Sequence, residues 1–94
     1  MIDRELRKCI AEIGGNNVVV LDNPSFDQSI VGMSTDDRVI YDWTLMVDEL
    51  VNDENMSHED AIEFISYNTM RAIPYLHDDA PIIMVYNREY ILEG

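Results

Sequence analysis

The sequence predicts one α+β domain over residues 1–94. We expect two layers, with two to three helices on one face of a mainly antiparallel sheet of about four strands. Three observations support this fold class. The chain has 94 residues, which is the size of a single domain. Apolar side chains make up 47% of it, enough for a packed core. Segments with helical spacing alternate with short β-branched runs in the order α-β-β-β-α-α-β.

The N-terminal segment has the pattern of a short amphipathic helix. Leu6, Ile10 and Ile13 recur at intervals of four and three residues, which places them on one stripe of a helix over residues 3–13. The pair Gly14-Gly15 is expected to end this helix, because glycine adopts the backbone conformations of helix C-termini at little cost.

Three strands are expected next. The run Val18-Val19-Val20-Leu21 is short, β-branched and bounded by turn-forming residues, so it predicts a buried strand. Residues 29–33 and 39–41 predict two further strands. The polar stretch 34–38 between them favours a hairpin.

Two helices are expected in the middle of the chain. Asp42 can accept hydrogen bonds from free backbone N–H groups and so cap a helix that follows it. A second helix is expected to begin at Ser57, with Asp60 close to the capping-box position, and to end at Pro74. The apolar faces are formed by Trp43, Met46, Val47 and Leu50 in the first helix and by Ala61, Ile62, Ile65, Thr69 and Ala72 in the second.

The C-terminal part predicts a last strand and an apolar tail. Pro81 precedes the run 82–86, which is rich in β-branched and aromatic residues. Tyr90, Ile91 and Leu92 follow. Their apolar character indicates that the tail packs against this chain or against another one.

Charge is distributed unevenly along the chain, whose formal net charge is −13 at pH 7. Residues 22–63 carry twelve acids and one base, a net charge of −11, whereas residues 1–13 are neutral overall. If this segment supplies about a third of a surface of roughly 5,600 Å², it has about one net charge per 170 Å², within about a factor of two of duplex DNA. The density predicts either a phosphate-like face that binds a basic protein or an acidic surface with no target.

The candidate partner-binding residues are acidic side chains of that segment, each of which would pair with Arg or Lys of a partner. They are Asp36, Asp37, Asp48, Glu49, Asp53, Glu54, Glu59, Asp60 and Glu63. Four of them lie near the C-terminus of the helix after Asp42, where the helix dipole disfavours acids by roughly a few tenths of a kcal/mol each. Selection for an acidic surface explains this cost, and so does a frayed helix end.

The composition disfavours several classes of protein. An acidic chain does not attract nucleic acid or anionic membranes electrostatically. No apolar run reaches the roughly 18 residues of a membrane helix. Cys9 is the only cysteine, which leaves no internal disulfide. We therefore expect a soluble, cytoplasmic protein.

No catalytic, cofactor-binding or metal site is predicted. The string His77-Asp78-Asp79 has potential ligands but no second histidine at ligand spacing. Asp53, Asn55 and Ser57 are spaced like the start of a calcium loop, but His58 stands where that loop needs glycine. The acids occur in doublets, without the apolar surroundings that separate the pKa values of catalytic carboxyls. We expect a protein that is not an enzyme.

Aromatic residues and methionines allow two interpretations. Tyr41 and Trp43 flank Asp42, which is typical either of a surface that takes up arginine by stacking and ion pairing or of aromatic rings packed in the core. A soft binding surface and core packing are likewise the alternatives for Met33, Met46, Met56, Met70 and Met84.

Several strings between residues 30 and 86 resemble small uncharacterised proteins from phages and prophages of Gram-positive, often gut-dwelling, bacteria. The strings are Tyr67-Asn68-Thr69-Met70-Arg71-Ala72-Ile73-Pro74-Tyr75, Ile30-Val31-Gly32, Arg38-Val39-Ile40-Tyr41-Asp42, Met56-Ser57-His58-Glu59-Asp60-Ala61-Ile62-Glu63 and Ala80-Pro81-Ile82-Ile83. The resemblance implies a phage-encoded protein of the bacterial cytoplasm and supplies no catalytic residues. Within the first string, Asn68, Arg71 and Tyr75 are expected either to contact a partner or to bond loop carbonyls and hold the turn at Pro74.

Two functions follow as hypotheses. Small acidic phage proteins include inhibitors of bacterial defence nucleases, such as anti-CRISPR proteins. By that analogy the chain is expected to act as a DNA mimic in the basic nucleic-acid channel of such a nuclease, for example a CRISPR effector. The alternative is a phage accessory module without enzymatic activity that self-associates, for example as a homodimer, or binds a phage partner through an apolar face. Ile91, Leu92 and the methionines favour this alternative.

Overall fold

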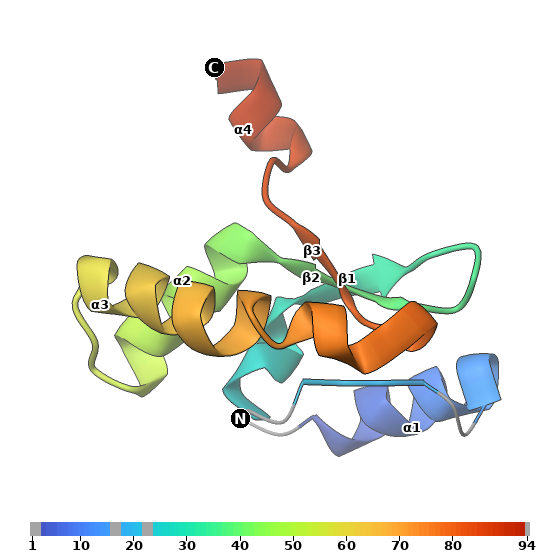
Figure 1. The fold of residues 1–94 in the computed structure, drawn as a ribbon. Helices are drawn as coiled ribbons and strands as arrows, with labels where there is room; N and C mark the ends of the chain where they lie inside the picture. Colours follow the sequence, from blue (N-terminus) through green and yellow to red (C-terminus); the bar gives the residue numbers. More distant parts are fainter. Residues whose placement is uncertain (1–2, 16–17, 22–23, 94) are drawn as a thin grey trace.

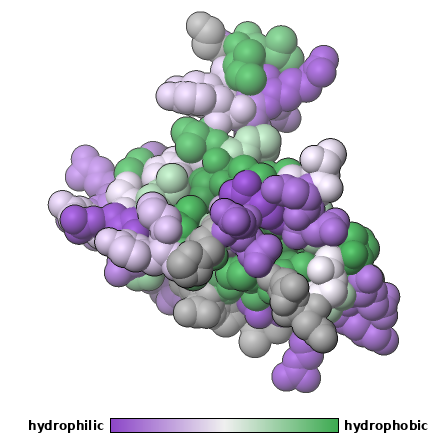
Figure 2. Space-filling view, turned by 45° about the vertical axis from the view of Figure 1, so that its right-hand side comes forward, coloured by the Kyte–Doolittle hydropathy of each residue, from purple (hydrophilic) through white to green (hydrophobic). Residues whose placement is uncertain are grey.

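The computed structural model describes residues 3–15, 18–21 and 24–93. It is an α+β fold in which helices surround a three-stranded sheet (Figure 1). In that view α1 (Arg4–Gly14) lies below the sheet. The last helix, α4 (Arg88–Glu93), stands above the rest of the molecule in Figures 1 and 2. The α+β class predicted from the sequence is confirmed, but the predicted sheet needs correction.

The sheet has the order β1-β2-β3, with β2 in the middle. β1 (Ile30–Met33) pairs antiparallel with β2 (Val39–Asp42), which is the predicted hairpin. β2 also pairs in parallel with β3 (Ile82–Met84), which is shorter than the predicted run 82–86. The sheet is therefore mixed and has three strands, so the prediction of a mainly antiparallel sheet of about four strands is wrong.

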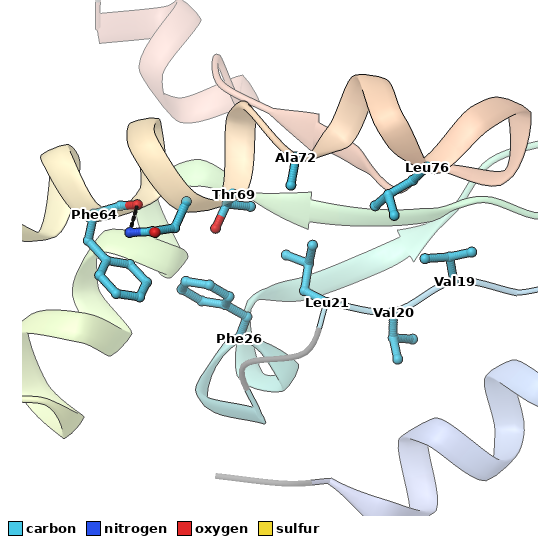
Figure 3. Close-up of a pocket in the computed structure, with 9 residues that line it drawn as sticks. Val19, Val20, Leu21, Phe26, Phe64, Thr69, Ala72 and Leu76 are labelled. Atoms are coloured by element: carbon cyan, nitrogen blue, oxygen red, sulfur yellow. Dashed lines mark hydrogen bonds between the residues drawn. The ribbon is translucent and has the colours of Figure 1, made fainter.

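The missing strand is the β-branched segment 18–21, which joins no sheet. Its labelled side chains point alternately to opposite sides in Figure 3, as in an extended chain. However, the backbone N–H of Leu21 donates to the hydroxyl of Tyr41 at 2.9 Å, and its carbonyl accepts from Nη2 of Arg7 at 3.4 Å. Side chains thus bond the backbone of Leu21, and the segment lies outside the sheet, between α1 and η4 (Ile73–Asp79).

The helix starts that the sequence predicts are confirmed. The carboxylate of Asp42 accepts from the first free backbone N–H groups of α2 (Trp43–Asp53). The hydroxyl of Ser57 does the same for α3 (His58–Phe64), and the carboxylate of Asp3 for α1. Each cap acts within three residues of the helix start, so local sequence is sufficient to specify it.

The sequence predicts one helix from Ser57 to Pro74, but the second half of this stretch is not α-helical. α3 continues into a π-helical segment, η3 (Ile65–Met70), so this helix ends before Pro74, which lies in η4. The side-chain amide of Asn68 donates to the carbonyl oxygen of Phe64 at 3.1 Å. In an α-helix the carbonyl of Phe64 would instead accept a hydrogen bond from the backbone N–H of Asn68. Of the predicted apolar face, Ala61, Ile65 and Thr69 are buried, Ile62 is half-buried and Ala72 is exposed.

The core is formed by β2, α2, α3, the first residue of η3 and the short helix η2 (Pro24–Ser29), together with Ile10 of α1 and Leu21. Its largest fully buried side chains include Tyr41, Phe26, Met46, Leu50 and Ile65. Met33, Met56 and Met70 are partly buried and pack against this cluster, which supports the core interpretation of the methionines. The predicted stripe on α1 is only partly used, because Ile10 is buried but Ile13 is 66% exposed.

A buried carboxylate joins the N-terminal elements. The side chain of Asp27 in η2 is 0% exposed and forms a two-pronged ion pair with Arg7 of α1, with Nε–Oδ2 at 2.7 Å and Nη2–Oδ1 at 2.8 Å. The backbone N–H of Asp3 donates to the same carboxylate at 2.9 Å. Burial alone would raise the pKa of Asp27, but these hydrogen bonds and the charge of Arg7 hold the pKa below its ordinary value of 3.8.

Asp27→Asn is expected to lower the free energy of unfolding by about 3 kcal/mol at pH 7, because Arg7 loses its counterion. Since the pKa of Asp27 is lowered in the folded state, its contribution is present above pH 3.8 and is lost as the pH falls through the folded value. Urea unfolding at pH 7 and at lower pH measures both effects. Arg7→Met and the double variant complete a double-mutant cycle, in which strictly additive losses would contradict coupling of the pair.

Candidate functional site

Seven of the nine candidate acids lie on α2, on α3 and in the loop that joins them. The chain has no lysine or arginine between residues 43 and 70. α2 and α3 pack against each other, and their connecting loop is at the left end of the molecule in Figure 1. We call this set the acidic lobe: Asp48, Glu49, Asp53, Glu54, Glu59, Asp60 and Glu63.

The other two candidates, Asp36 and Asp37, lie in the turn between β1 and β2, at the right end of the molecule in Figure 1. The hydroxyl of Ser34 donates to Asp36, which also pairs with Nη1 of Arg38 at 3.8 Å. The hydrogen bond from Ser34 and the charge of Arg38 lower the pKa of Asp36. Asp37 has a φ of 61°, in the left-handed region that aspartate tolerates in turns. Both residues serve the turn, and the fold does not bring them to the acidic lobe.

Within the acidic lobe the acids form two sets. On α2, Glu49 is half-buried beside Asp53 and Asp48. Burial raises the pKa of Glu49, and the hydrogen bond and negative charge of Asp53 raise it further, with a smaller contribution from Asp48. On α3, Asp60 and Glu63 line a shallow hollow of about 450 Å³. The sequence alone did not distinguish these two sets.

In the part of the chain that the structure describes, no side chain pairs with the carboxylates of α3. Glu59, Asp60 and Glu63 are exposed, and among residues 3–15, 18–21 and 24–93 no hydrogen bond or ion pair engages their carboxylate oxygens. They differ in this respect from Asp36, which Ser34 and Arg38 engage. These three carboxylates are therefore available to cations of a partner.

A second hollow lies between α2, α3 and the C-terminal segment. Its volume is about 370 Å³, and Trp43, Asp48, Tyr86 and Tyr90 are among the residues that line it. Trp43 is half-buried. It packs against the core, as one interpretation of the sequence expected, and it also lines the hollow, so part of its ring surface faces this hollow. Tyr41, the other aromatic residue beside Asp42, is 0% exposed and belongs to the core.

A third hollow, of about 330 Å³, is apolar. It lies between the segment 18–21 and the helical stretch from α3 to η4 (Figure 3). The side chains of Leu21, Phe26 and Phe64 converge there, and Thr69 adds a hydroxyl. No described residue that lines this hollow titrates, so it provides no group for acid–base chemistry.

Within residues 67–75, some side chains stabilise the helical segment and others are exposed on the surface. Asn68 bonds a carbonyl, as one interpretation expected, although the carbonyl belongs to the preceding helix and not to a loop. The guanidinium carbon of Arg71 lies 5.3 Å from the ring centroid of Tyr67, a cation–π contact. Tyr75 is 80% exposed.

Among the described residues, no three His, Cys, Asp or Glu side chains are grouped so that they can hold a metal ion. The side chain of His77 lies outside the described part. None of the described helices has the length and apolar character needed to cross a lipid bilayer.

No family model matches the chain, and the comparisons with curated proteins and with solved structures also found no match. Function is therefore inferred from the geometry and the charges of the chain itself.

Glu49→Gln is expected to raise the free energy of unfolding at pH 7 by about 0.5 kcal/mol, because it removes one of two like charges four residues apart on α2. The pKa of Glu49 is raised in the folded state, so the folded protein binds this proton more tightly; this contribution to stability is complete below pH 4.5 and is lost as the pH rises from there through the raised folded value. The gain should therefore vanish near pH 3.5. Urea unfolding at both pH values tests this, with Glu12→Gln on α1 as the control, and a gain that persists at pH 3.5 would contradict it.

Proposed function

We propose that this protein uses the acidic lobe to bind a basic surface of another protein, one that otherwise binds nucleic acid. The observation that carries the proposal is the presence of seven carboxylates on two packed helices and their loop, without a lysine or arginine. Crowded like charges repel one another and destabilise the folded state. A groove lined with Lys and Arg would turn this repulsion into attraction on binding.

The positions of the basic residues support an oriented encounter. Three of the six, Arg4, Arg7 and Lys8, lie on α1 and offset the three acids of residues 1–13, so this end of the chain is neutral overall whereas the acidic lobe is not. In Figure 1 α1 is at the lower right, whereas the loop between α2 and α3 is at the left end. A molecule with this charge distribution turns its acidic lobe toward a cationic groove during approach, which raises the association rate at low salt.

The narrower form of the proposal concerns the kind of partner. A bacterial nuclease with a positively charged DNA or RNA channel, such as a CRISPR effector, offers a groove of the required charge. A phage origin, which the sequence resemblance between residues 30 and 86 implies, favours a defence nuclease as the partner. Inhibition would then result from competition between the acidic lobe and nucleic acid for the channel.

Release of labelled duplex DNA from a panel of basic bacterial nucleases, including CRISPR effectors, tests this proposal. We expect displacement from at least one of them in about 50 mM NaCl, and weaker displacement at higher salt. The triple variant Glu59→Gln, Asp60→Asn, Glu63→Gln should displace DNA about tenfold less well, because an exposed ion pair contributes about 0.5 kcal/mol and the loss of three amounts to about 1.4 kcal/mol, a factor of about ten.

The matched control removes three exposed acids outside the acidic lobe, with Asp78→Asn, Asp79→Asn and Glu93→Gln. It has the same net charge as the first triple variant and should displace DNA like the unaltered protein. Equal losses in the two triple variants would show that only total charge matters, and the acidic lobe would then have no special role.

A second function is favoured by α4. None of its residues is buried, and Tyr90, Ile91 and Leu92 are 54%, 64% and 74% exposed. Figure 2 shows hydrophobic residues on this helix at the top of the molecule, with further hydrophobic residues on the body beneath it. Three adjacent exposed apolar residues are typical of an interaction surface, here for a second copy of the chain.

Self-association through α4 is expected to increase with salt, because two copies of net charge −13 repel each other at low ionic strength. Sedimentation at about 50 mM and 1 M NaCl measures this, and Ile91→Glu with Leu92→Glu should restore the monomer at high salt. Tyr75→Glu is the control, since Tyr75 is exposed but lies outside α4. A monomer at both salt concentrations would exclude this second function.

A further inference from the structure

We infer that the hollow between α2, α3 and the C-terminal segment receives an arginine side chain of the partner. This inference rests on the proposed function, since it specifies the chemistry by which a basic partner is recognised. The acidic lobe alone attracts Arg and Lys equally. The hollow adds aromatic surface, which is what distinguishes the two cations.

The walls of the hollow are aromatic. Trp43 begins α2, and Tyr86 and Tyr90 come from the segment after β3 and from α4. The rings of Tyr86 and Tyr90 have centroids 5.0 Å apart and are inclined at 39°. The two tyrosines are 63% and 54% exposed, so ring surface is accessible from solvent.

The hollow also contains a carboxylate and an apolar floor. Asp48 lines it from α2 and is exposed, while Val47 is 4% exposed and Ile62 is half-buried. A guanidinium group can stack on the rings and pair with Asp48, while the methylene groups of the same side chain lie against the apolar floor. The volume of the hollow, about 370 Å³, accommodates one long side chain.

One buried side chain positions both aromatic walls. Asp42 is 5% exposed, and its Oδ1 accepts from the backbone N–H of Thr44 at 2.9 Å, at the start of α2. Its Oδ2 accepts from the side-chain amide of Asn87 at 3.2 Å. Oδ1 of Asn87 in turn accepts from the backbone N–H of Tyr90 at 2.8 Å, which caps α4. Asp42 thus holds the helix that begins with Trp43 and, through Asn87, the helix that carries Tyr90.

Arginine fits this hollow better than lysine. Its guanidinium is planar and weakly hydrated, so it stacks on aromatic rings at a lower desolvation cost than an ammonium group. The chain already contains such a contact, because Arg71 lies over the ring of Tyr67. We therefore expect the hollow to prefer arginine at equal peptide charge.

The experiment compares three ten-residue peptides that are identical except at four positions, which hold arginine, lysine or uncharged citrulline. Trp43 is the only tryptophan, so its fluorescence reports directly on the hollow. In about 50 mM NaCl the arginine peptide should bind at least fivefold more tightly than the lysine peptide and should shift the emission of Trp43. The citrulline peptide should bind weakest.

Variants of the protein test which side chains cause the preference for the arginine peptide. Tyr86→Ala with Tyr90→Ala should reduce the affinity for the arginine peptide to that for the lysine peptide. The control, Tyr67→Ala with Tyr75→Ala, removes two exposed tyrosines outside the hollow and should keep the preference. Asn87→Ala should weaken the preference without removing an aromatic ring. Circular dichroism checks that each variant is folded.

The outcomes separate this inference from the proposed function. Equal affinities for the arginine and lysine peptides, or a preference that survives loss of Tyr86 and Tyr90, would overturn the arginine hollow. Loss of DNA displacement in the triple variant of Glu59, Asp60 and Glu63 would still support the proposed function. Conversely, an arginine preference together with no displacement of DNA from any nuclease would keep the hollow and reject the proposed function.

Discussion

The ion pair between Asp27 and Arg7 is the constraint on which the N-terminal half of the structure depends. A carboxylate that is 0% exposed is costly to bury unless its oxygens are paired, and here Arg7 and the backbone of Asp3 pair them. The same guanidinium reaches the carbonyl of Leu21. One buried charge therefore connects α1, the segment 18–21 and η2, and η2 packs on α2, which carries three of the seven acids of the acidic lobe.

The parts of the fold that were predictable are those specified over a few residues. The caps at Asp42 and Ser57 lie next to the backbone groups they satisfy, and the hairpin turn lies between its own strands. The segment 18–21 was mispredicted as a strand, and the backbone of Leu21 at its end is bonded by side chains from distant positions, Tyr41 and Arg7, which the local sequence does not indicate. The π-helical segment was also missed, since propensity does not indicate where an amide such as Asn68 will take over a helix carbonyl.

For the candidate site, the sequence determined the number of charges and the fold determined their arrangement. The density of acids between residues 22 and 63 was evident from composition. Composition does not show that Asp36 and Asp37 lie at the other end of the molecule or that Glu49 is half-buried beside Asp53. The aromatic hollow was equally inaccessible, because Trp43 and Tyr90 are 47 positions apart in the printed chain. Only the aromatic pair that flanks Asp42, Tyr41 and Trp43, indicated an aromatic surface near an acid.

Asp42 is a helix cap that also holds an element far away in the sequence. One carboxylate oxygen is sufficient to cap α2, which leaves the other to hold Asn87 and, through it, α4. A helix of six residues without a buried side chain has little intrinsic stability. Its orientation therefore depends on this contact at its base, and so does the separation between Tyr90 and Trp43. The cap that starts α2 therefore also holds α4, and with it the aromatic walls of the hollow that we infer to receive a guanidinium group.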